Sequence, residues 1–190
     1  MTTVSIIYFS GSGHTTKLAE AVTKGAASVA DVQTNLIAIN GDDIAKGRYK
    51  NDAVLAQLDA SDAIVFGSPT YMGGPAAQFK AFADATGERW FRSVWRDKLS
   101  SGFTVSNSPS GDKFSTLQYF QTLAMQHGMI WAGLGEMPMQ PNGVNRLGNF
   151  SGAAAQAGYE SPEVAPSAED KLTGELLGKR VATLAAKLKK

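Results

Sequence analysis

The sequence contains no cysteine among its 190 residues, which excludes disulfide bonds, thiolate metal sites and thiol nucleophiles. It also has little net charge, because 18 Lys and Arg residues against 17 Asp and Glu leave a formal charge of +1. Such a chain has no strong field to attract a nucleic acid backbone or an anionic membrane surface. We therefore expect neither nucleic acid nor a membrane as a partner, and any redox chemistry must come from a cofactor.

Long hydrophobic runs are also absent. The first nine residues carry no basic leader and only a short apolar run, and no stretch approaches the ~20 apolar residues of a membrane span. Together with the lack of cysteine, this favours a cytoplasmic protein. Two histidines without any cysteine offer little for metal ligation, so no metal is expected.

Hydrophobic residues make up 43% of the chain and 20 residues are glycine, a composition typical of a globular α/β protein. The length predicts one domain over residues 1–190. Five segments rich in β-branched and aromatic residues alternate with segments of helical spacing, the pattern of a parallel sheet with helices on both faces. The five predicted strands are 4–9, 32–39, 63–66, 102–105 and 129–132.

The stretch from about 133 to 166 breaks this alternation. It holds four prolines, many small residues and no sustained period. We therefore predict a long loop excursion, of the kind that is usually functional or interfacial.

Three polar loops follow the first, third and fourth predicted strands: residues 10–15, 68–74 and 106–112. In an open parallel sheet, ligands bind beyond the carboxyl ends of the strands. Each loop alone could be an ordinary turn, but their coincidence at one edge predicts a ligand site.

The first loop joins a strand to a helix and is crowded with hydroxyls and glycines, so its N–H groups and the helix dipole suit a phosphate. It has no Lys or Arg and lacks the Gly-Lys-Ser/Thr ending of a nucleotide P-loop. A dinucleotide fingerprint would need a glycine at Thr16 and an acidic residue within 36–40, and neither is present. A phosphate monoester held by neutral donors is the favoured ligand. The second loop suits a flat ring, and the uncharged donors of the third suit its polar edge.

With these residues in view, the chain resembles flavodoxin-like FMN proteins, and most closely the WrbA-type NAD(P)H:quinone oxidoreductases, over essentially its whole length. The resemblance rests on residues 10–15, 67–71 with 78–82, 123–129, and the closing run from 152 to 178. It implies a flavodoxin-like doubly wound sandwich with strand order 2-1-3-4-5. It also implies FMN as cofactor, NADH or NADPH as electron donor, and a homo-oligomer, either a dimer or a tetramer.

The resemblance also implies roles for individual residues. The FMN phosphate would be held by Ser10, Gly11, Ser12, Gly13, His14 and Thr15. The isoalloxazine ring would be bordered by Pro69, Thr70, Tyr71, Met72 and Gly73. Its pyrimidine side would be hydrogen-bonded by Ser106, Asn107, Ser108, Pro109, Ser110 and Gly111. His127 would reach flavin across a subunit interface of a tetramer, and Trp90 would line the substrate pocket.

Taken without the resemblance, His127 would be a histidine that ends a helix, and Trp90 a core or surface-shielding aromatic. The chain also departs from the family's pattern. Ser12 stands where an aromatic residue is frequent, Tyr71 where an arginine is common, and residues 107–110 replace a glycine-rich run. These departures fall on the ring and donor side of the site, so FMN binding is better supported than reaction with a nicotinamide.

We predict an FMN-dependent oxidoreductase that transfers hydride from NAD(P)H through FMN to a quinone-like acceptor, with no side chain as a chemical catalyst. The alternative is a flavodoxin-type carrier that passes single electrons between protein partners without direct nicotinamide oxidation. Such carriers resemble shorter and more acidic chains, yet the departures at Ser12 and Tyr71 keep this alternative open. A non-catalytic FMN-binding or scaffold protein is a third hypothesis.

Overall fold

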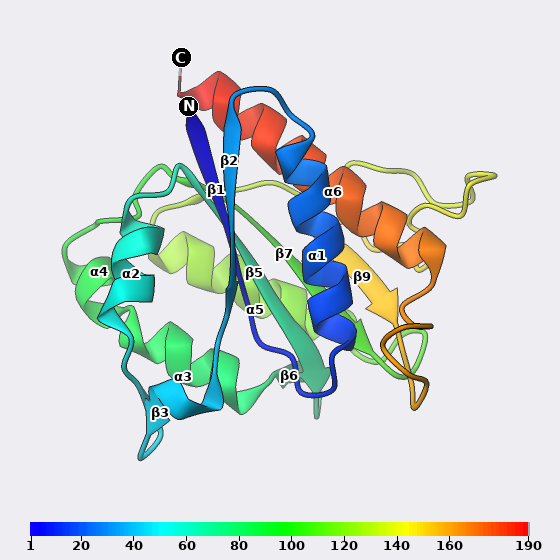
Figure 1. Ribbon diagram of the computed structural model, residues 1–190, viewed down its shortest axis with the longest axis horizontal. Coiled ribbons are helices and arrows are strands. Elements are labelled where there is room, and N and C mark those ends of the chain that lie inside the picture. Colours follow the sequence, from blue (N-terminus) through cyan, green and yellow to red (C-terminus); the bar gives the residue numbers. More distant parts are fainter. Residues whose placement is uncertain (190) are drawn as a thin grey trace.

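The computed structural model describes residues 1–189, and its centre is a parallel sheet with helices on both sides (Figure 1). Five strands lie side by side in the order β2 (Val32–Ala38), β1 (Thr2–Tyr8), β5 (Ala63–Tyr71), β7 (Leu99–Ser106) and β8 (Ile130–Trp131). In terms of the five predicted strands this is the order 2-1-3-4-5. The doubly wound, flavodoxin-like fold is therefore confirmed.

The sheet has seven strands rather than five. β6 (Gly74–Pro75) pairs antiparallel with the end of β5, and β9 (Ala153–Gln156) pairs parallel with β7. β8 pairs with the first two residues of β7 and β9 with the last four, so the fifth position is a strand split by a long insertion. The prediction of a long loop excursion over about 133–166 was wrong at β9, which belongs to the sheet. Its three consecutive alanines have low β-propensity, and tertiary pairing overrides it.

β5 continues beyond the predicted end at Phe66, through a proline. β1 pairs with β5 only as far as Gly67. Pro69 therefore has no strand partner on the β1 side, and its missing N–H removes no hydrogen bond from the sheet. β7 begins three residues before the predicted Gly102. The buried hydroxyls of Ser100 and Ser101 donate to the carbonyls of Ile64 and Ala132, at 3.0 and 2.7 Å, which allows polar residues in a central strand.

Helices cover both faces of the sheet (Figure 1). α1 (His14–Ala27) and α6 (Ala168–Leu188) lie on the first face. The second face carries α2 (Asp52–Asp59), α3 (Ala77–Ala85) and α5 (Lys113–Gln126); the short α4 (Gly87–Phe91) follows α3 and buries no residue. A short 3-10 turn (Gly41–Asp43) and a hairpin of β3 (Ile44–Ala45) and β4 (Arg48–Tyr49) precede α2. Among the helices formed by residues 1–189, none is long and apolar enough to cross a membrane.

Alternation along the strands feeds one hydrophobic cluster on each face. In β1, Val4 and Ile6 pack with α1 and α6, while Ile7 joins the aromatic cluster under α3 and α5. Because both faces are covered, residues 4–8 of this strand are apolar at every position except Ser5. Full burial of each such side chain contributes about 1.5–3 kcal/mol.

Glycines allow α1 and α6 to cross at very short range. A Cβ atom on Gly178 would lie 1.9 Å from the carbonyl oxygen of Val22, and one on Gly25 would lie 1.8 Å from that of Glu175. The two helix backbones are therefore in direct contact, and neither glycine has room for a side chain.

We expect Gly178→Ala to lower the free energy of unfolding by about 3 kcal/mol, because the new methyl group must push the two helices apart. Gly87→Ala is the matched control, since Gly87 also lies in a helix but a Cβ atom there would meet nothing within 4 Å. Urea denaturation of both variants measures the difference. Equal effects would contradict the close crossing.

Candidate cofactor site

The three predicted loops meet at one cavity of about 230 Å³. β1 pairs with β5 and β5 with β7, all in parallel, so the carboxyl ends of these strands lie next to one another. Many predicted residues line the cavity: Ser12, His14 and Thr15 from the first loop, Pro69, Thr70 and Tyr71 from the second, and Ser106 and Asn107 from the third.

The remaining predicted residues of these loops shape the loops rather than line the cavity. The Ser10 hydroxyl accepts a hydrogen bond from the N–H of Gly13 at 3.0 Å, which closes the first loop. Met72 and Gly73 are both left-handed, with φ of 48° and 76°, and form the turn between β5 and β6. Residues 108–111 form the outer part of the third loop.

The N-terminus of α1 opens at the first loop without a cap. Gly13 precedes the helix in a left-handed conformation with φ of 91°, no side chain caps the helix, and its first turn has no acidic residue. The first N–H groups of an α-helix have no partner within the helix, and they attract anions. This end of α1 is therefore suited to a phosphate although the loop contains no cation.

His14 is buried, and both of its ring nitrogens are used within the protein. Nε2 lies 2.7 Å from the carbonyl oxygen of Glu160, so it carries the proton and donates, and Nδ1 accepts from the Ser12 hydroxyl at 3.0 Å. Only the backbone N–H of His14 is left for a phosphate. The imidazole instead fastens the first loop to the segment that follows β9.

That segment, residues 157–162, is a part of the site that the sequence did not reveal. Ala157, Gly158 and Tyr159 line the cavity. Pro162 packs so closely on Gly13 that a Cβ atom there would lie 2.7 Å from the proline ring. The segment was missed because β9 was missed. Once β9 is placed beside β7, the residues after it must lie at the same edge as the other three loops.

Tyr71 stands at the mouth of the cavity beside the first loop. Its hydroxyl is so close to Gly11 that a Cβ atom at that position would lie 2.4 Å away. Tyr71 itself is half-exposed, and Tyr159 across the cavity is 99% exposed. Two aromatic side chains are thus available to a flat ligand at the surface.

A chain of buried hydroxyls fixes the floor of the site. The Thr104 hydroxyl donates to the carbonyl of Ser68 at 2.7 Å, so it can only accept from Thr70, 2.8 Å away. Thr70 in turn accepts from Thr116 at 2.8 Å. One directed chain therefore ties the ends of β5 and β7 to α5.

Residues 4–140 match the family described as NADPH-dependent FMN reductase. The chain belongs to this family. It is 38% identical over 193 residues to a protein named Flavodoxin FldP from Pseudomonas aeruginosa, covering 99% of both chains. It is 33% identical over 203 residues to a protein named NAD(P)H dehydrogenase (quinone) from Chromohalobacter salexigens, also covering 99% of both. A crystal structure described as the flavodoxin, WrbA-like protein from Agrobacterium tumefaciens aligns with TM-score 0.78 and 41% identity, over 98% of this chain and 99% of that one. The predicted resemblance is confirmed.

In this FMN reductase family member, His127 and Trp90 lie away from the cavity. His127 follows the C-terminal end of α5, at the opposite edge of the sheet, and is 4% exposed. Its ring stacks on Trp95 at 4.5 Å and its Nε2 lies 2.9 Å from the Thr86 hydroxyl. Because that hydroxyl donates to the carbonyl of Ala83, Nε2 must donate, which leaves the buried Nδ1 without a proton or a partner among the described residues. Trp90 is 50% exposed and lines a separate hollow of about 510 Å³.

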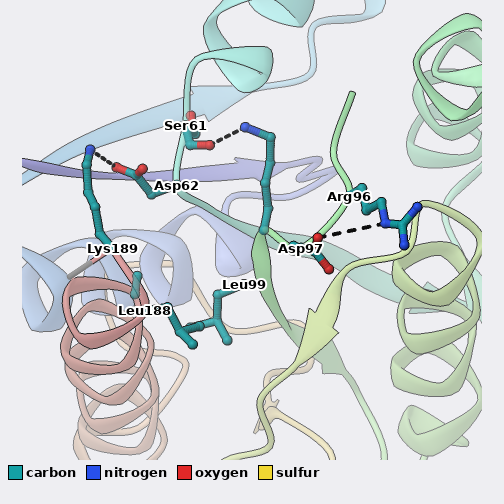
Figure 2. Close-up of a pocket in the computed structure, with 9 residues that line it drawn as sticks. Ser61, Asp62, Arg96, Asp97, Leu99, Leu188 and Lys189 are labelled. Atoms are coloured by element: carbon teal, nitrogen blue, oxygen red, sulfur yellow. Dashed lines mark hydrogen bonds and ion pairs between the residues drawn. The ribbon is translucent and has the colours of Figure 1, made fainter. Parts of the chain in front are cut away.

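Another hollow lies at the amino ends of the strands, around Ser61, Asp62 and Leu99 (Figure 2). Its charged side chains are already bonded within the protein. Figure 2 shows the Lys189 ammonium directed at Asp62, at 2.8 Å, and it also donates to the carbonyl of Met1 at 2.9 Å. These contacts fasten the C-terminal helix to the start of β1.

The buried His127 makes stability depend on pH. Burial lowers the pKa of His127 to about 4. Between pH 6.5 and 4 the unfolded chain therefore binds a proton that the folded chain does not, and stability falls as pH falls. By pH 5 we expect this one group to have lowered the free energy of unfolding by about 2 kcal/mol relative to neutral pH. Urea unfolding of the wild type and of His127→Phe, which keeps a ring against Trp95, measures it. An equally steep loss in the variant would contradict the assignment.

Proposed function

We propose that this protein is an FMN-dependent oxidoreductase. When bound, FMN would supply the chemistry, namely hydride transfer from NADH or NADPH and electron transfer to a quinone-like acceptor. The observation that carries the proposal is the meeting of the β1, β5 and β7 loops around one cavity that borders the uncapped start of α1.

The first loop fits the phosphate of FMN. The N–H groups of the first turn of α1 and the hydroxyl of Thr15 are the proposed donors, and Ser12, whose hydroxyl is bonded to His14, is proposed to border the phosphate. No acidic side chain in that turn opposes an anion. Ser10, Gly11 and Gly13 support the phosphate through the shape of the loop.

The other loops fit the ring. Pro69, Thr70 and Tyr71 are proposed to lie along the ring, and the third loop at its polar edge; Ser106 and Asn107 line the cavity, and residues 108–111 continue the loop beside it. The cavity of about 230 Å³ is smaller than the roughly 300–1,000 Å³ of enclosed ligand sites. The ring is therefore proposed to sit at the surface, beside Tyr159, with one face open to a donor.

The side chains bind and orient rather than transfer protons. His14 is the one imidazole at the cavity, and both of its nitrogens are bonded within the protein. The chain's own contribution is therefore position and the exclusion of water from the phosphate end, which the 157–162 segment covers.

An electron carrier is the second candidate. The observation in its favour concerns the side of the site that would face the electron donor. There Ser12 and Tyr71 stand in place of the aromatic residue and the arginine that are frequent in quinone reductases. The relatives are divided in the same way, because one is named a flavodoxin and another an NAD(P)H dehydrogenase (quinone).

The proposal includes assembly into a dimer or tetramer and a location in the cytoplasm. Neither Trp90 nor His127 lines the cavity of its own chain, so either would contribute only to another subunit's site. The half-exposed Trp90, beside the exposed Phe91 and Met125, suits this role better than the buried His127. Analytical ultracentrifugation of the FMN-loaded protein tests the assembly, and a monomer would contradict it.

Ser12→Asp tests the phosphate assignment. A carboxylate at the start of α1 stabilises the helix dipole but repels a phosphate, so we expect FMN affinity to fall about 100-fold while the protein stays folded. Ser12→Asn is the control, because it has the same size without the charge. Riboflavin, which lacks the phosphate, should bind both variants equally. Equal FMN affinity of the two variants would overturn the assignment.

Anaerobic reduction tests the activity itself. The FMN-loaded protein is mixed with NADH or NADPH while the flavin absorbance is followed. Rapid bleaching by either donor, reversed by benzoquinone, is expected of the oxidoreductase. Retained FMN that neither donor bleaches would favour the carrier.

A further inference from the structure

Lys113 is a buried lysine directly behind the third loop. It is the first residue of α5 and is 2% exposed. Its ammonium donates to the carbonyl of Ser108 at 2.6 Å and to that of Pro109 at 3.0 Å. Gly111 and Asp112 are both left-handed, with φ of 52° and 51°, and this double turn brings the lysine back beneath its own loop.

Keeping Lys113 charged in this buried position costs desolvation free energy. Its pKa is lowered to about 8, mainly by burial; the nearby Asp170 acts to raise the pKa and Arg146 acts to lower it. Asp170 is 1% exposed, is held by Arg146 through two hydrogen bonds of 2.7 Å, and accepts from the N–H of Gln156. At neutral pH the ammonium therefore remains charged in a site where a methionine would avoid the desolvation penalty. A buried cation of this kind needs a reason beyond packing.

The geometry points to Lys113 as a positioning residue for the flavin ring, which holds two carbonyl groups of the third loop inward so that the N–H of Ser110 faces the ring's polar edge. This inference rests on the proposed function, because it requires the FMN ring to lie beside residues 106–111. Under this inference Lys113 touches no ligand itself, but it sets the shape of the loop that contacts the ring.

Peptide geometry gives the reason. In a planar trans peptide the C=O and the following N–H point in opposite directions. With the Pro109 carbonyl fixed on the buried ammonium, the N–H of Ser110 must point away from the core. Within residues 1–189, the N–H groups of Asn107, Ser108, Ser110 and Gly111 meet no protein acceptor. The loop thus offers donors, and the pyrimidine edge of a flavin carries carbonyl oxygens that accept.

Lys98 provides a matched control. Its ammonium also donates to two backbone carbonyls, those of Asp59 at 2.8 Å and of Ser61. Burial likewise lowers the pKa of Lys98. It precedes β7 at the amino end of the strands, whereas Lys113 lies just beyond the carboxyl end of the same strand. The two lysines therefore hold carbonyls in the same way at opposite edges of one sheet.

The experiment compares Lys113→Met with Lys98→Met in the full chain. FMN dissociation constants come from fluorescence quenching, midpoint potentials of bound FMN from spectroelectrochemistry, and stability from urea unfolding. For Lys113→Met we expect FMN binding about 10- to 100-fold weaker and a more negative potential, since ring-edge donors that favour the reduced flavin are lost. Lys98→Met should bind FMN with an affinity within about twofold of the wild type and with the same potential, although it also loses hydrogen bonds from an ammonium to two backbone carbonyls.

Three results would overturn the inference: unchanged FMN affinity in Lys113→Met, equal weakening in Lys98→Met, or weaker binding with an unchanged potential, which would make Lys113 merely structural. If the wild type itself does not bind FMN, the proposed function fails, and this outcome is distinct from the other three. Should Lys113→Met not fold, Lys113→Arg and Lys113→Gln ask the same question. Arg keeps the cation and should bind FMN about tenfold more tightly than Gln, whereas equal affinities would overturn the inference.

Discussion

The parallel pairing of β1, β5 and β7 is the constraint on which the rest of the structure depends. Because helices cover both faces, these strands can carry function only where they end. The chain leaves β1 toward β2 on one side and reaches β5 on the other, so the strand order reverses at β1. A crevice at that point is where open α/β sheets bind ligands, and the cavity lies there.

Because the fifth strand is split, a fourth segment, residues 157–162, borders the site beside the three loops. β8 and β9 pair with the two ends of β7, and the insertion between them leaves the sheet without disturbing its order. Arg146, within that insertion, is anchored on the buried Asp170 of α6, which also binds the backbone of β9. The chain after β9 then reaches the first loop, where the Glu160 carbonyl binds His14. Two segments far apart in the sequence are thereby held together at the phosphate end.

Much of this arrangement could be predicted from the sequence because its signals are local. Residues 4–9 are apolar almost without interruption, and the polar loops interrupt such segments at a fixed place in the topology. β9 could not be predicted, because three alanines carry no strand signal and its pairing with β7 is a tertiary effect. Lys113 was missed for a related reason: a lysine in sequence suggests an exposed side chain, and only the left-handed turn at Gly111 and Asp112 buries it. The partner-subunit roles of His127 and Trp90 stay predictions.

The central claim is that the uncapped start of α1 and the loops of β5 and β7 together hold one molecule of FMN. A crystal structure of the FMN-loaded protein tests it most directly. The account predicts the phosphate against the N–H groups of the first turn of α1, with the ring between Tyr71 and the third loop. A phosphate bound away from that turn would contradict the account, whatever the activity of the protein.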